Sequence, residues 1–293
     1  MDNRFRSLLA ATSVVLTCVA AALVPGLSSG LTSPSAAETA AGITIGTYEN
    51  ADIRALPSGR TFLVVKPQNY DSSRTYPVIL AFAGWKITPE KMMRSTRIDR
   101  EAPDAVVVYP AGIANAWAGA PYASTSIDQD LAFVRAIIGD VSTNYSGDKD
   151  TVFAVGHSNG GGMASTLACH APELLDGVAT VSGAFYNPTV EGCAPGEVPA
   201  LLIHGSNDTL ISFQGGVRHG VPYQGVETVL STFGTRNSCD MSQLSSHDEG
   251  PATTVTPAGC LSPTRLVKVN GGTHSWPSSP SATTAVVTFF NSL

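Results

Sequence analysis

Three polar residues occupy positions from which a serine can be made a nucleophile. Ser158 lies in Gly156–Gly160, which reads GHSNG, between an apolar β-branched run and a helical segment rich in small residues. Asp208 and His274 each follow a later apolar run, in that order along the chain. A serine hydroxyl attacks poorly unless a histidine takes its proton and a carboxylate orients that histidine. The types and order of these residues therefore predict a catalytic triad of Ser158, Asp208 and His274.

The glycines around Ser158 predict a sharp turn from a strand into a helix, which exposes the serine at the edge of a sheet. The amide of Asn159, at the start of that helix, then points toward the oxygen on which negative charge develops. The second donor is expected in the loop after the apolar run 76–82, at the amide of Trp85. The alternative is a glycine-rich turn that cradles phosphate, but the stretch lacks the lysine and the GxGxxG pattern of such turns.

Aromatic residues in the neighbouring loops predict the substrate contacts. Trp85, Trp117 and Trp276 all follow runs that read as strands, so we expect them at the edge where the serine emerges. Large rings there can hold a sugar, an aryl group or an apolar polyester chain. We assign substrate contacts to Trp117, Trp276 and His157; the alternatives are loop-core packing for the two tryptophans and local packing for His157. The other histidines are expected to be structural (His170 and His204) or to lie away from strand ends (His219 and His247).

The elements that must position these residues follow from hydrophobic periodicity. Apolar runs that read as strands cover 60–65, 76–82, 105–110, 151–156, 177–183, 199–205 and 265–272. Helical patterns cover 126–142, 160–170, 226–237 and 281–291, and Thr125 or Ser126 would cap the first. This alternation predicts an α/β fold, a mostly parallel sheet with helices on both faces. The Ser/Thr/Pro-rich segment 248–263 is expected to be a surface excursion held by Cys260.

The composition excludes several classes of protein. With 43% hydrophobic and 14% charged residues, a chain of 293 residues can bury a full core. The net charge of −6 and the scattered basic residues argue against a nucleic-acid partner. The motifs call for no cofactor and no metal, and they indicate no obligate protein partner.

The first residues predict export from the cell. Two arginines precede an apolar run over 8–24, which is followed by a proline and a small-x-small site at 35–37. This pattern is typical of a secretory signal peptide, so we expect 1–37 to be removed and 38–293 to form a single catalytic domain. The alternative is an uncleaved membrane anchor, because the run approaches the length that spans a bilayer.

The cysteines of the exported chain form an even set. Cys169, Cys193, Cys239 and Cys260 include no CxxC pair, so metal binding is not expected. Disulfides persist in oxidising compartments. Of the three possible connectivities, we expect Cys169 with Cys193 and Cys239 with Cys260, because each of these pairs closes a loop within one region of the chain.

Four motifs together resemble a known family. The stretches GHSNGG, HGSND, GGTHSWP and NAWAG are similar to those of the secreted polyhydroxybutyrate depolymerase group, which is related to feruloyl and acetylxylan esterases. The resemblance implies an α/β-hydrolase fold with Ser158, Asp208 and His274 as the triad. Members usually have a His-Gly pair after the third strand, where this chain has Ala83 and Gly84. That departure concerns the shape of the pocket beside the amide of Trp85, and hence the substrate.

These observations predict a secreted serine esterase that works through an acyl-enzyme. The expected substrate is the ester of a polyester oligomer or of an acylated polysaccharide. Two alternatives remain: an acyltransferase, which shares every motif and differs in excluding water, and a non-catalytic binding protein that keeps the hydrolase fold.

Overall fold

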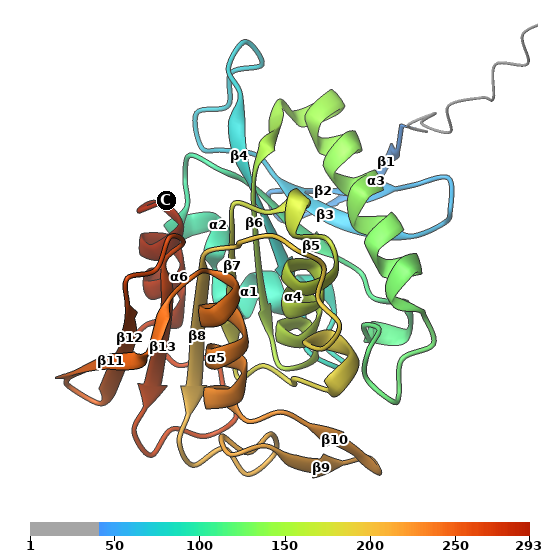
Figure 1. The fold of residues 1–293 in the computed structure, drawn as a ribbon. Helices are drawn as coiled ribbons and strands as arrows, with labels where there is room; N and C mark the ends of the chain where they lie inside the picture. Colours follow the sequence, from blue (N-terminus) through green and yellow to red (C-terminus); the bar gives the residue numbers. More distant parts are fainter. Residues whose placement is uncertain (1–40) are drawn as a thin grey trace, which may run out of the picture. The chain divides into compact units, whose positions relative to one another are not determined.

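An eleven-stranded sheet organises the chain in this computed structural model, which describes residues 41–293 (Figure 1). The strands lie in the order β1-β2-β3-β5-β4-β6-β7-β8-β13-β12-β11. Their bounds are β1 (Ile43–Tyr48), β2 (Ala51–Ala55), β3 (Thr61–Val65), β4 (Tyr76–Phe82), β5 (Val106–Pro110), β6 (Gly147–His157), β7 (Gly177–Val181), β8 (Ala200–Gly205), β11 (Asp240–Glu249), β12 (Ala252–Ala258) and β13 (Thr264–Val269). From β5 to β13 in this order the strands pair in parallel, with antiparallel strands on both sides. The predicted mostly parallel sheet is therefore confirmed.

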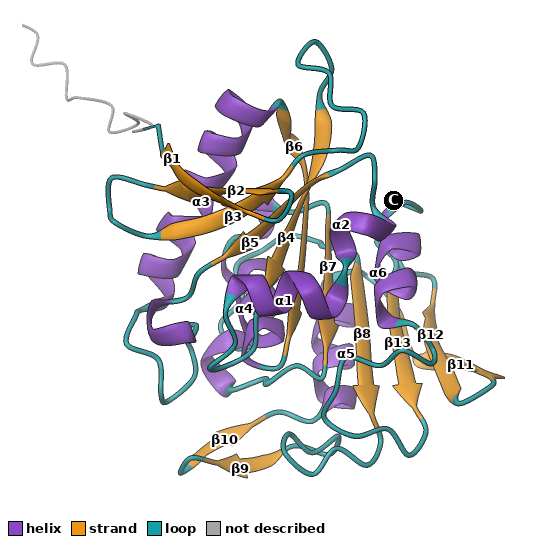
Figure 2. Cartoon of the chain, turned by 180° about the vertical axis from the view of Figure 1, so that it is seen from behind, coloured by secondary structure: helices purple, strands orange, loops and turns teal. Residues whose placement is uncertain are grey.

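Helices cover both faces of this sheet, as the two opposite views show (Figures 1 and 2). The helices are α1 (Pro89–Thr96), α2 (Ile98–Glu101), α3 (Ile127–Tyr145), α4 (Asn159–His170), α5 (Val226–Arg236) and α6 (Ala282–Phe290), with short 3₁₀ turns at Ile113–Asn115, Pro172–Leu174 and Asn187–Thr189. Buried residues of α3, α4 and α5 join one hydrophobic cluster with the sheet. Those of α1, α2 and α6 join a second cluster. Because both faces are covered, the central strands are apolar along most of their length.

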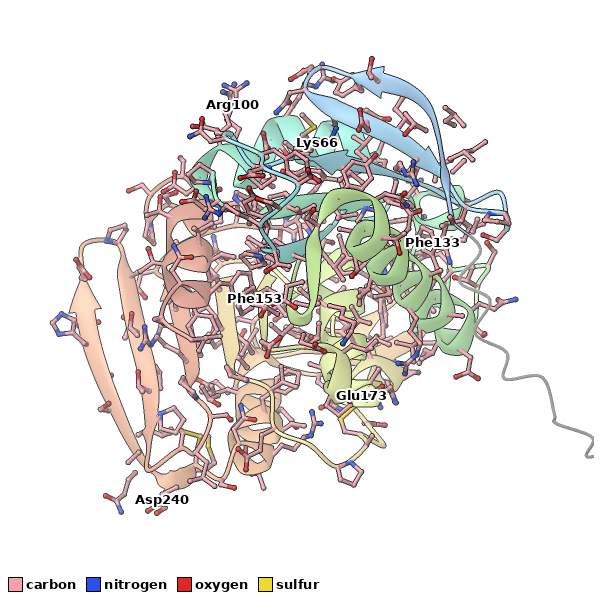
Figure 3. All side chains as sticks on the ribbon, turned by 90° about the horizontal axis from the view of Figure 1, so that it is seen from above. Lys66, Arg100, Phe133, Phe153, Glu173 and Asp240 are labelled. Atoms are coloured by element: carbon pink, nitrogen blue, oxygen red, sulfur yellow. A yellow bond between two sulfur atoms is a disulfide. The ribbon has the colours of Figure 1, made fainter. Side chains whose placement is uncertain are left out.

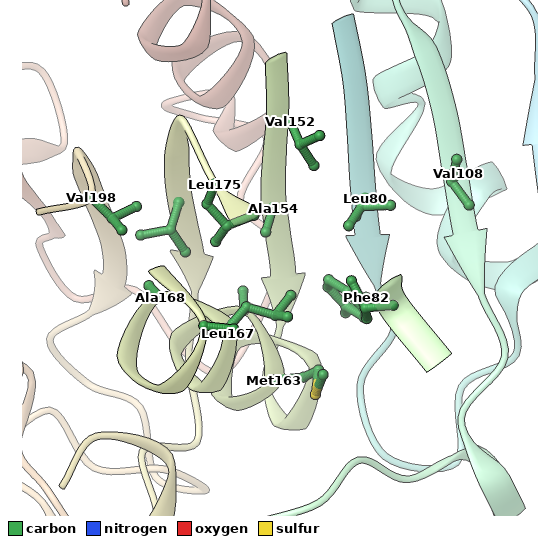
Figure 4. Packing of buried hydrophobic residues seen from close by; sticks show 14 of the residues in the cluster. Leu80, Phe82, Val108, Val152, Ala154, Met163, Leu167, Ala168, Leu175 and Val198 are labelled. Carbon is green, nitrogen blue, oxygen red and sulfur yellow. The ribbon is translucent and has the colours of Figure 1, made fainter. Parts of the chain in front are cut away.

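Alternation along β4 shows how one strand serves both clusters. Leu80 and Phe82 pack with Met163 of α4 on one face (Figure 4). Ile79 and Ala81 face the other cluster, with α1 and α6. A strand that points successive side chains to opposite faces can be apolar throughout only when both faces are buried. Packing on both sides thus holds the carboxyl end of β4, where the functional loop begins.

One sequence expectation about the sheet was wrong. The segment 248–263 was expected to be a surface excursion, but it contains the end of β11 and the whole of β12, which pairs with β11 and also with β13. The two strands extend the sheet by an antiparallel hairpin. The Thr and Val residues of β12 favour a strand, whereas the polar, exposed composition of β11 resembles that of a loop because β11 forms the edge of the sheet. A separate two-stranded hairpin, β9 (Gly216–Arg218) and β10 (Val221–Tyr223), lies outside the main sheet.

Both predicted disulfides are present. Cys169 pairs with Cys193, and Cys239 pairs with Cys260. The second bridge joins the segment before β11 to the segment after β12, next to Asp240 in Figure 3. It therefore closes the base of the hairpin that leads into β13.

Loss of this second bridge should destabilise the chain locally before it unfolds globally. A cross-link across 21 residues of separation contributes about 3 kcal/mol by restricting the unfolded chain. We expect the double variant Cys239→Ser/Cys260→Ser to melt about 5 to 10 °C lower. Because the hairpin leads into β13 and on to His274, ester hydrolysis should be lost below the melting temperature. The measurement is thermal unfolding alongside activity; an unchanged melting temperature would contradict this expectation.

Residues 41–293 contain neither a membrane-spanning helix nor a cluster that could hold a metal. Among residues 41–293, no helix has both the length and the apolarity to cross a bilayer. Within the same range, no group of three or more His, Cys, Asp or Glu side chains is arranged to hold a metal ion. The predicted signal peptide, 1–37, lies outside the described residues.

Candidate active site

The turn that carries Ser158 is strained, and its neighbours are glycines for a steric reason. Ser158 has φ 55° and ψ −119° between the end of β6 and the start of α4. A left-handed φ is costly for a serine and persists only where the surroundings hold it. A Cβ on Gly156 would collide with the carbonyl of Gly160, and a Cβ on Gly160 would collide with the carbonyl of Phe82. The backbone therefore packs closely enough to present the serine side chain at this corner.

Backbone hydrogen bonds fix the same corner from the neighbouring strand. The N–H of Ser158 donates to the carbonyl of Val181 in β7 at 3.0 Å. Its carbonyl accepts from the N–H groups of Gly162, at 3.0 Å, and Ala184, at 2.9 Å. The strained residue is thus tied to α4 and to the segment after β7.

Parallel pairing brings the three predicted triad residues to one edge of the sheet. Strands β6, β7, β8 and β13 are successive parallel neighbours, so the loops after their carboxyl ends meet (Figure 1). His274, after β13, lies with its Nε2 2.9 Å from Oγ of Ser158. Its Nδ1 lies 2.7 Å from Oδ2 of Asp208, after β8. Ser158, His274 and Asp208 therefore form one continuous hydrogen-bonded chain.

The carboxylate of Asp208 is buried and fully hydrogen-bonded. Its residue is 5% exposed. The N–H groups of Leu210 and Ile211 donate to Oδ1 at 2.9 and 2.8 Å. Burial by itself raises the pKa of Asp208, but hydrogen bonds from His204, His274 and Ile211 outweigh burial and hold that pKa below its ordinary value. Asp208 therefore remains a carboxylate opposite His274.

His157 lies beside His274 and Trp276 and makes no hydrogen bond to Ser158. Its ring centroid is 5.3 Å from that of His274 and 6.3 Å from that of Trp276. Burial, followed by the neighbouring His274, lowers the pKa of His157 to about 3. Its Nε2 is buried with no hydrogen-bond partner among residues 41–293. The substrate contact assigned to His157 stays a prediction.

The loop after β4 lies against Ser158, as an oxyanion hole requires. A Cβ built on Gly84 would lie 3.3 Å from Cβ of Ser158. Within the described part of the chain, the N–H groups of Trp85 and Asn159 donate to no protein acceptor. Two unengaged amides close to a serine are the donors that an oxyanion hole would need, so the roles expected for Trp85 and Asn159 stay predictions.

The substrate role expected for Trp117 is wrong. Trp117 is 1% exposed and packs edge-on against Phe82, with ring centroids 5.1 Å apart. Its Nε1 donates to the carbonyl of Ala83 at 2.9 Å. Its backbone N–H donates to Oδ1 of Asn159 at 2.8 Å, and the Asn159 amide donates back to its carbonyl. Trp117 is therefore a buried residue that links the loop after β4 to the start of α4.

The other two tryptophans have different surroundings. Trp276 is half-buried, packs against the second hydrophobic cluster, and donates from Nε1 to Oγ1 of Thr283 at 2.9 Å. Trp85 is also half-buried, and its ring stacks on Tyr122 with centroids 4.2 Å apart and planes 18° apart. The ammonium of Lys86 lies 4.1 Å from the centroid of the same ring. Substrate contact by Trp276 stays a prediction.

Two histidines without an expected functional role lie near the candidate site, His219 beside Trp85 and His204 beside Asp208. His219 is exposed in the turn between β9 and β10, and its ring lies edge-on to Trp85 and Tyr122 at 5.3 and 5.2 Å. The His219–Gly220 pair is a signal for a tight hairpin turn. No local pattern indicated where that hairpin would pack. His204, expected to be structural, lies 3.2 Å from Oδ2 of Asp208. The sequence feature that could have indicated this contact is the spacing of four residues between His204 and Asp208.

The sheet topology, the strained serine turn and the serine–histidine–carboxylate chain define an α/β-hydrolase. A family model described as "Putative esterase" matches residues 53–191. Residues 53–191, rather less than half of the chain, are therefore similar to an esterase family, and the α/β-hydrolase assignment of the chain rests on its fold and site.

Individual proteins agree with this assignment. The chain is 30% identical over 225 residues to "Putative esterase NocK" of Nocardia uniformis subsp. tsuyamanensis, covering 69% of this chain and 65% of that protein. It is 27% identical to feruloyl esterase C of Emericella nidulans, covering 73% and 76% respectively. The solved acetyl xylan esterase from Aspergillus awamori superposes with a TM-score of 0.63 at 14% identity, over 86% of this chain and 99% of that one. The structural likeness concerns the fold.

Proposed function

We propose that this chain is a secreted serine esterase in which Ser158, His274 and Asp208 form the catalytic triad. The observation that carries the proposal is the hydrogen-bonded chain of 2.9 Å from Ser158 to His274 and 2.7 Å from His274 to Asp208. A histidine held by a buried carboxylate at one nitrogen and by a serine hydroxyl at the other is arranged to remove the hydroxyl proton.

The proposed reaction has two halves. Oγ of Ser158 attacks the ester carbonyl while its proton moves to Nε2 of His274, and the amides of Trp85 and Asn159 hold the resulting oxyanion. Collapse of this intermediate expels the alcohol, which takes the proton from His274, and leaves an acyl-serine ester. Water, deprotonated by the same Nε2, then attacks the acyl group and releases the acid and the free serine. Asp208 orients His274 throughout and stabilises its positive charge.

For the substrate, we propose esters of plant polysaccharides that carry an aromatic or short acyl group. Relatives named as feruloyl esterases and a structural neighbour named as an acetyl xylan esterase support this class. The half-buried ring of Trp85 follows directly on the oxyanion loop and stacks on Tyr122, so an apolar surface adjoins the proposed acyl site. Depolymerisation of polyhydroxybutyrate, the other expectation from the motifs, remains a prediction for the same assay.

The test is a hydrolysis panel on the chain and on Ser158→Ala. The panel comprises feruloylated arabinose, acetylated xylan, 3-hydroxybutyrate oligomers, p-nitrophenyl esters of C2 to C12 acids, and casein. Feruloyl, acetyl and short p-nitrophenyl esters should be cleaved, and long-chain esters and casein poorly. An added alcohol acceptor reveals any acyl transfer. Hydrolysis no faster than that by Ser158→Ala would overturn the proposal, and faster cleavage of casein would overturn its substrate class.

Truncation of the Trp85 ring should change which acyl group is preferred. Trp85→Ala keeps the backbone N–H but removes the ring that stacks on Tyr122. The ring of Trp85 is the proposed contact for the feruloyl ring, and an aromatic pair contributes about 1 kcal/mol beyond its buried area. The value of kcat/KM for the feruloyl ester should therefore fall about fivefold relative to the acetyl ester. Trp276→Ala is the comparison, because that ring packs on the second hydrophobic cluster and should change this ratio less. Equal ratios in all three proteins would contradict the expectation.

The disulfides support the proposed location. Two bridges between half-buried or buried cysteines suit an oxidising compartment outside the cytoplasm. Removal of 1–37 during export is part of the proposal. Mass spectrometry of the mature N-terminus after secretion tests it.

A further inference from the structure

A second histidine lies beside the proposed catalytic acid, near the same carboxylate oxygen that faces His274. His204 lies in β8, is 1% exposed, and has its Nε2 2.9 Å from the carbonyl of Ile211 and 3.2 Å from Oδ2 of Asp208. Both of these oxygens are acceptors only. Nε2 of His204 must therefore carry a hydrogen, which bonds the carbonyl of Ile211 and lies close to Oδ2 of Asp208.

Nε2 of His204 contacts both ends of the loop from Asp208 to Ile211. The N–H of Ile211 donates to Oδ1 of Asp208, while the carbonyl of the same residue accepts from His204. Oδ2 of Asp208 accepts from His274 at 2.7 Å and lies 3.2 Å from His204. The carboxylate is therefore held at both oxygens, and one histidine secures both its loop and the oxygen that faces His274.

Two aromatic rings flank the imidazole of His204. Phe185 and Phe213 flank it, with ring centroids at 6.4 and 6.0 Å. Its Nδ1 is buried without a hydrogen-bond partner among residues 41–293. A buried polar nitrogen without a partner is costly, so a phenyl or leucine side chain would suit this space better if packing were the requirement.

We propose that His204 is a positioning residue for ester hydrolysis, whose Nε2–H fixes the carboxylate of Asp208 in the orientation that His274 needs. The inference rests on the proposed function. It also predicts that the donor reduces the negative charge that Oδ2 presents to His274. Loss of the donor should therefore favour the protonated form of His274 and weaken its orientation together.

Few titratable groups complicate this expectation. Among residues 41–293, the titratable side chains near His274 are Asp208 and His157, and His204 lies next to Asp208. Burial and the nearby His274 lower the pKa of His157 to about 3, so it does not titrate in the range where histidine bases gain a proton. The acid limb of the kcat/KM profile then reports on His274 and its carboxylate.

Three substitutions separate the donor from the packing. His204→Gln places an amide N–H near the position of Nε2, His204→Asn withdraws it, and His204→Leu removes it. Tyr109→Phe is the matched control, because it deletes a different buried hydrogen bond to a carboxylate, the one of 2.8 Å to Asp99. Each is compared with the full chain by kcat, KM and pH profile on p-nitrophenyl acetate, by melting temperature, and by the low-field proton NMR resonance of the His274–Asp208 bond.

We expect His204→Leu and His204→Asn to lower kcat about tenfold with KM unchanged, since a hydrogen bond to a charged group is lost and no substrate contact is touched. The acid limb should move up by about half a pH unit. The low-field resonance should broaden, and His204→Gln should restore all three properties. Tyr109→Phe should lower the melting temperature only.

Two results would overturn the inference. One is a His204→Leu protein whose pH profile and low-field resonance match those of the unmodified chain. The other is a His204→Gln protein as impaired as His204→Leu. If the unmodified chain hydrolyses no ester faster than Ser158→Ala does, the proposed function fails instead, and the resonance still tests whether His204 orders the Asp208–His274 pair.

Discussion

Substitution of Ser158 by alanine should lower kcat for p-nitrophenyl acetate by about a million-fold, with little change in KM. The hydroxyl is the proposed nucleophile. No neighbouring side chain can replace it, because the strained turn presents only the side chain of Ser158 to His274. The remaining rate should be that of an oxyanion hole that can still bind the ester. Alanine keeps the Cβ, so the packing against Gly84 is retained.

The companion variants test whether the triad acts as a unit. His274→Ala should lose about as much activity as Ser158→Ala, and the double variant should lose hardly more than either single variant. Melting temperatures close to that of the unmodified chain serve as the folding control. Two outcomes would refute the assignment of the nucleophile. One is a double variant whose loss of activity is the product of the two single losses, and the other is a Ser158→Ala protein that still reacts with fluorophosphonate probes and esters.

The second large effect is expected for Asp208→Asn, which should lower kcat about ten-thousand-fold. The N–H groups of Leu210 and Ile211 donate to Oδ1, so the amide oxygen of asparagine should take that position. Its NH₂ group then faces Nδ1 of His274. A donor there forces the histidine to carry its hydrogen on Nε2, where it can no longer accept the proton of Ser158.

The same substitution separates catalysis from stability through pH. Hydrogen bonds to its charge hold the pKa of Asp208 below its ordinary value in the folded chain, despite burial. A depressed carboxylate contributes stability that is fully present above the unfolded pKa of about 3.9 and is lost as pH falls toward the folded pKa. The melting-temperature difference between the unmodified chain and Asp208→Asn should therefore shrink below about pH 4. A constant difference between pH 7 and pH 3 would contradict this explanation.

Much of the candidate site could be predicted because its signals are local. The glycines at 156 and 160 reflect close contacts between backbone segments around one turn, and a strand followed by such a turn is recognisable without the rest of the molecule. Asp208 and His274 each follow a run that only a buried parallel strand explains. Parallel strands place their carboxyl ends at one edge, so order along the chain implied proximity.

Side-chain environments could not be predicted in the same way. Trp117 follows a strand just as Trp85 does, yet Trp117 is buried against Phe82 while Trp85 stacks on Tyr122. Their surroundings depend on which loops pack over them, and no pattern within either loop contains that information. The hairpin of β11 and β12 was mistaken for an excursion for a related reason, since strands at the partly exposed end of a sheet need not be apolar.

By itself, the sequence determined the α/β class, both disulfide pairings and the candidates for nucleophile, acid and base. It also determined the order in which these candidates follow the central strands along the chain. These depend on hydrophobic period, turn chemistry and spacing, all of which act over a few residues. Only the tertiary structure decided the contacts made across the sheet edge: His204 against Asp208, Asn159 against Trp117, and the turn at His219 against Trp85. Such contacts join segments that are distant in sequence, and they arise from how separately formed elements pack together.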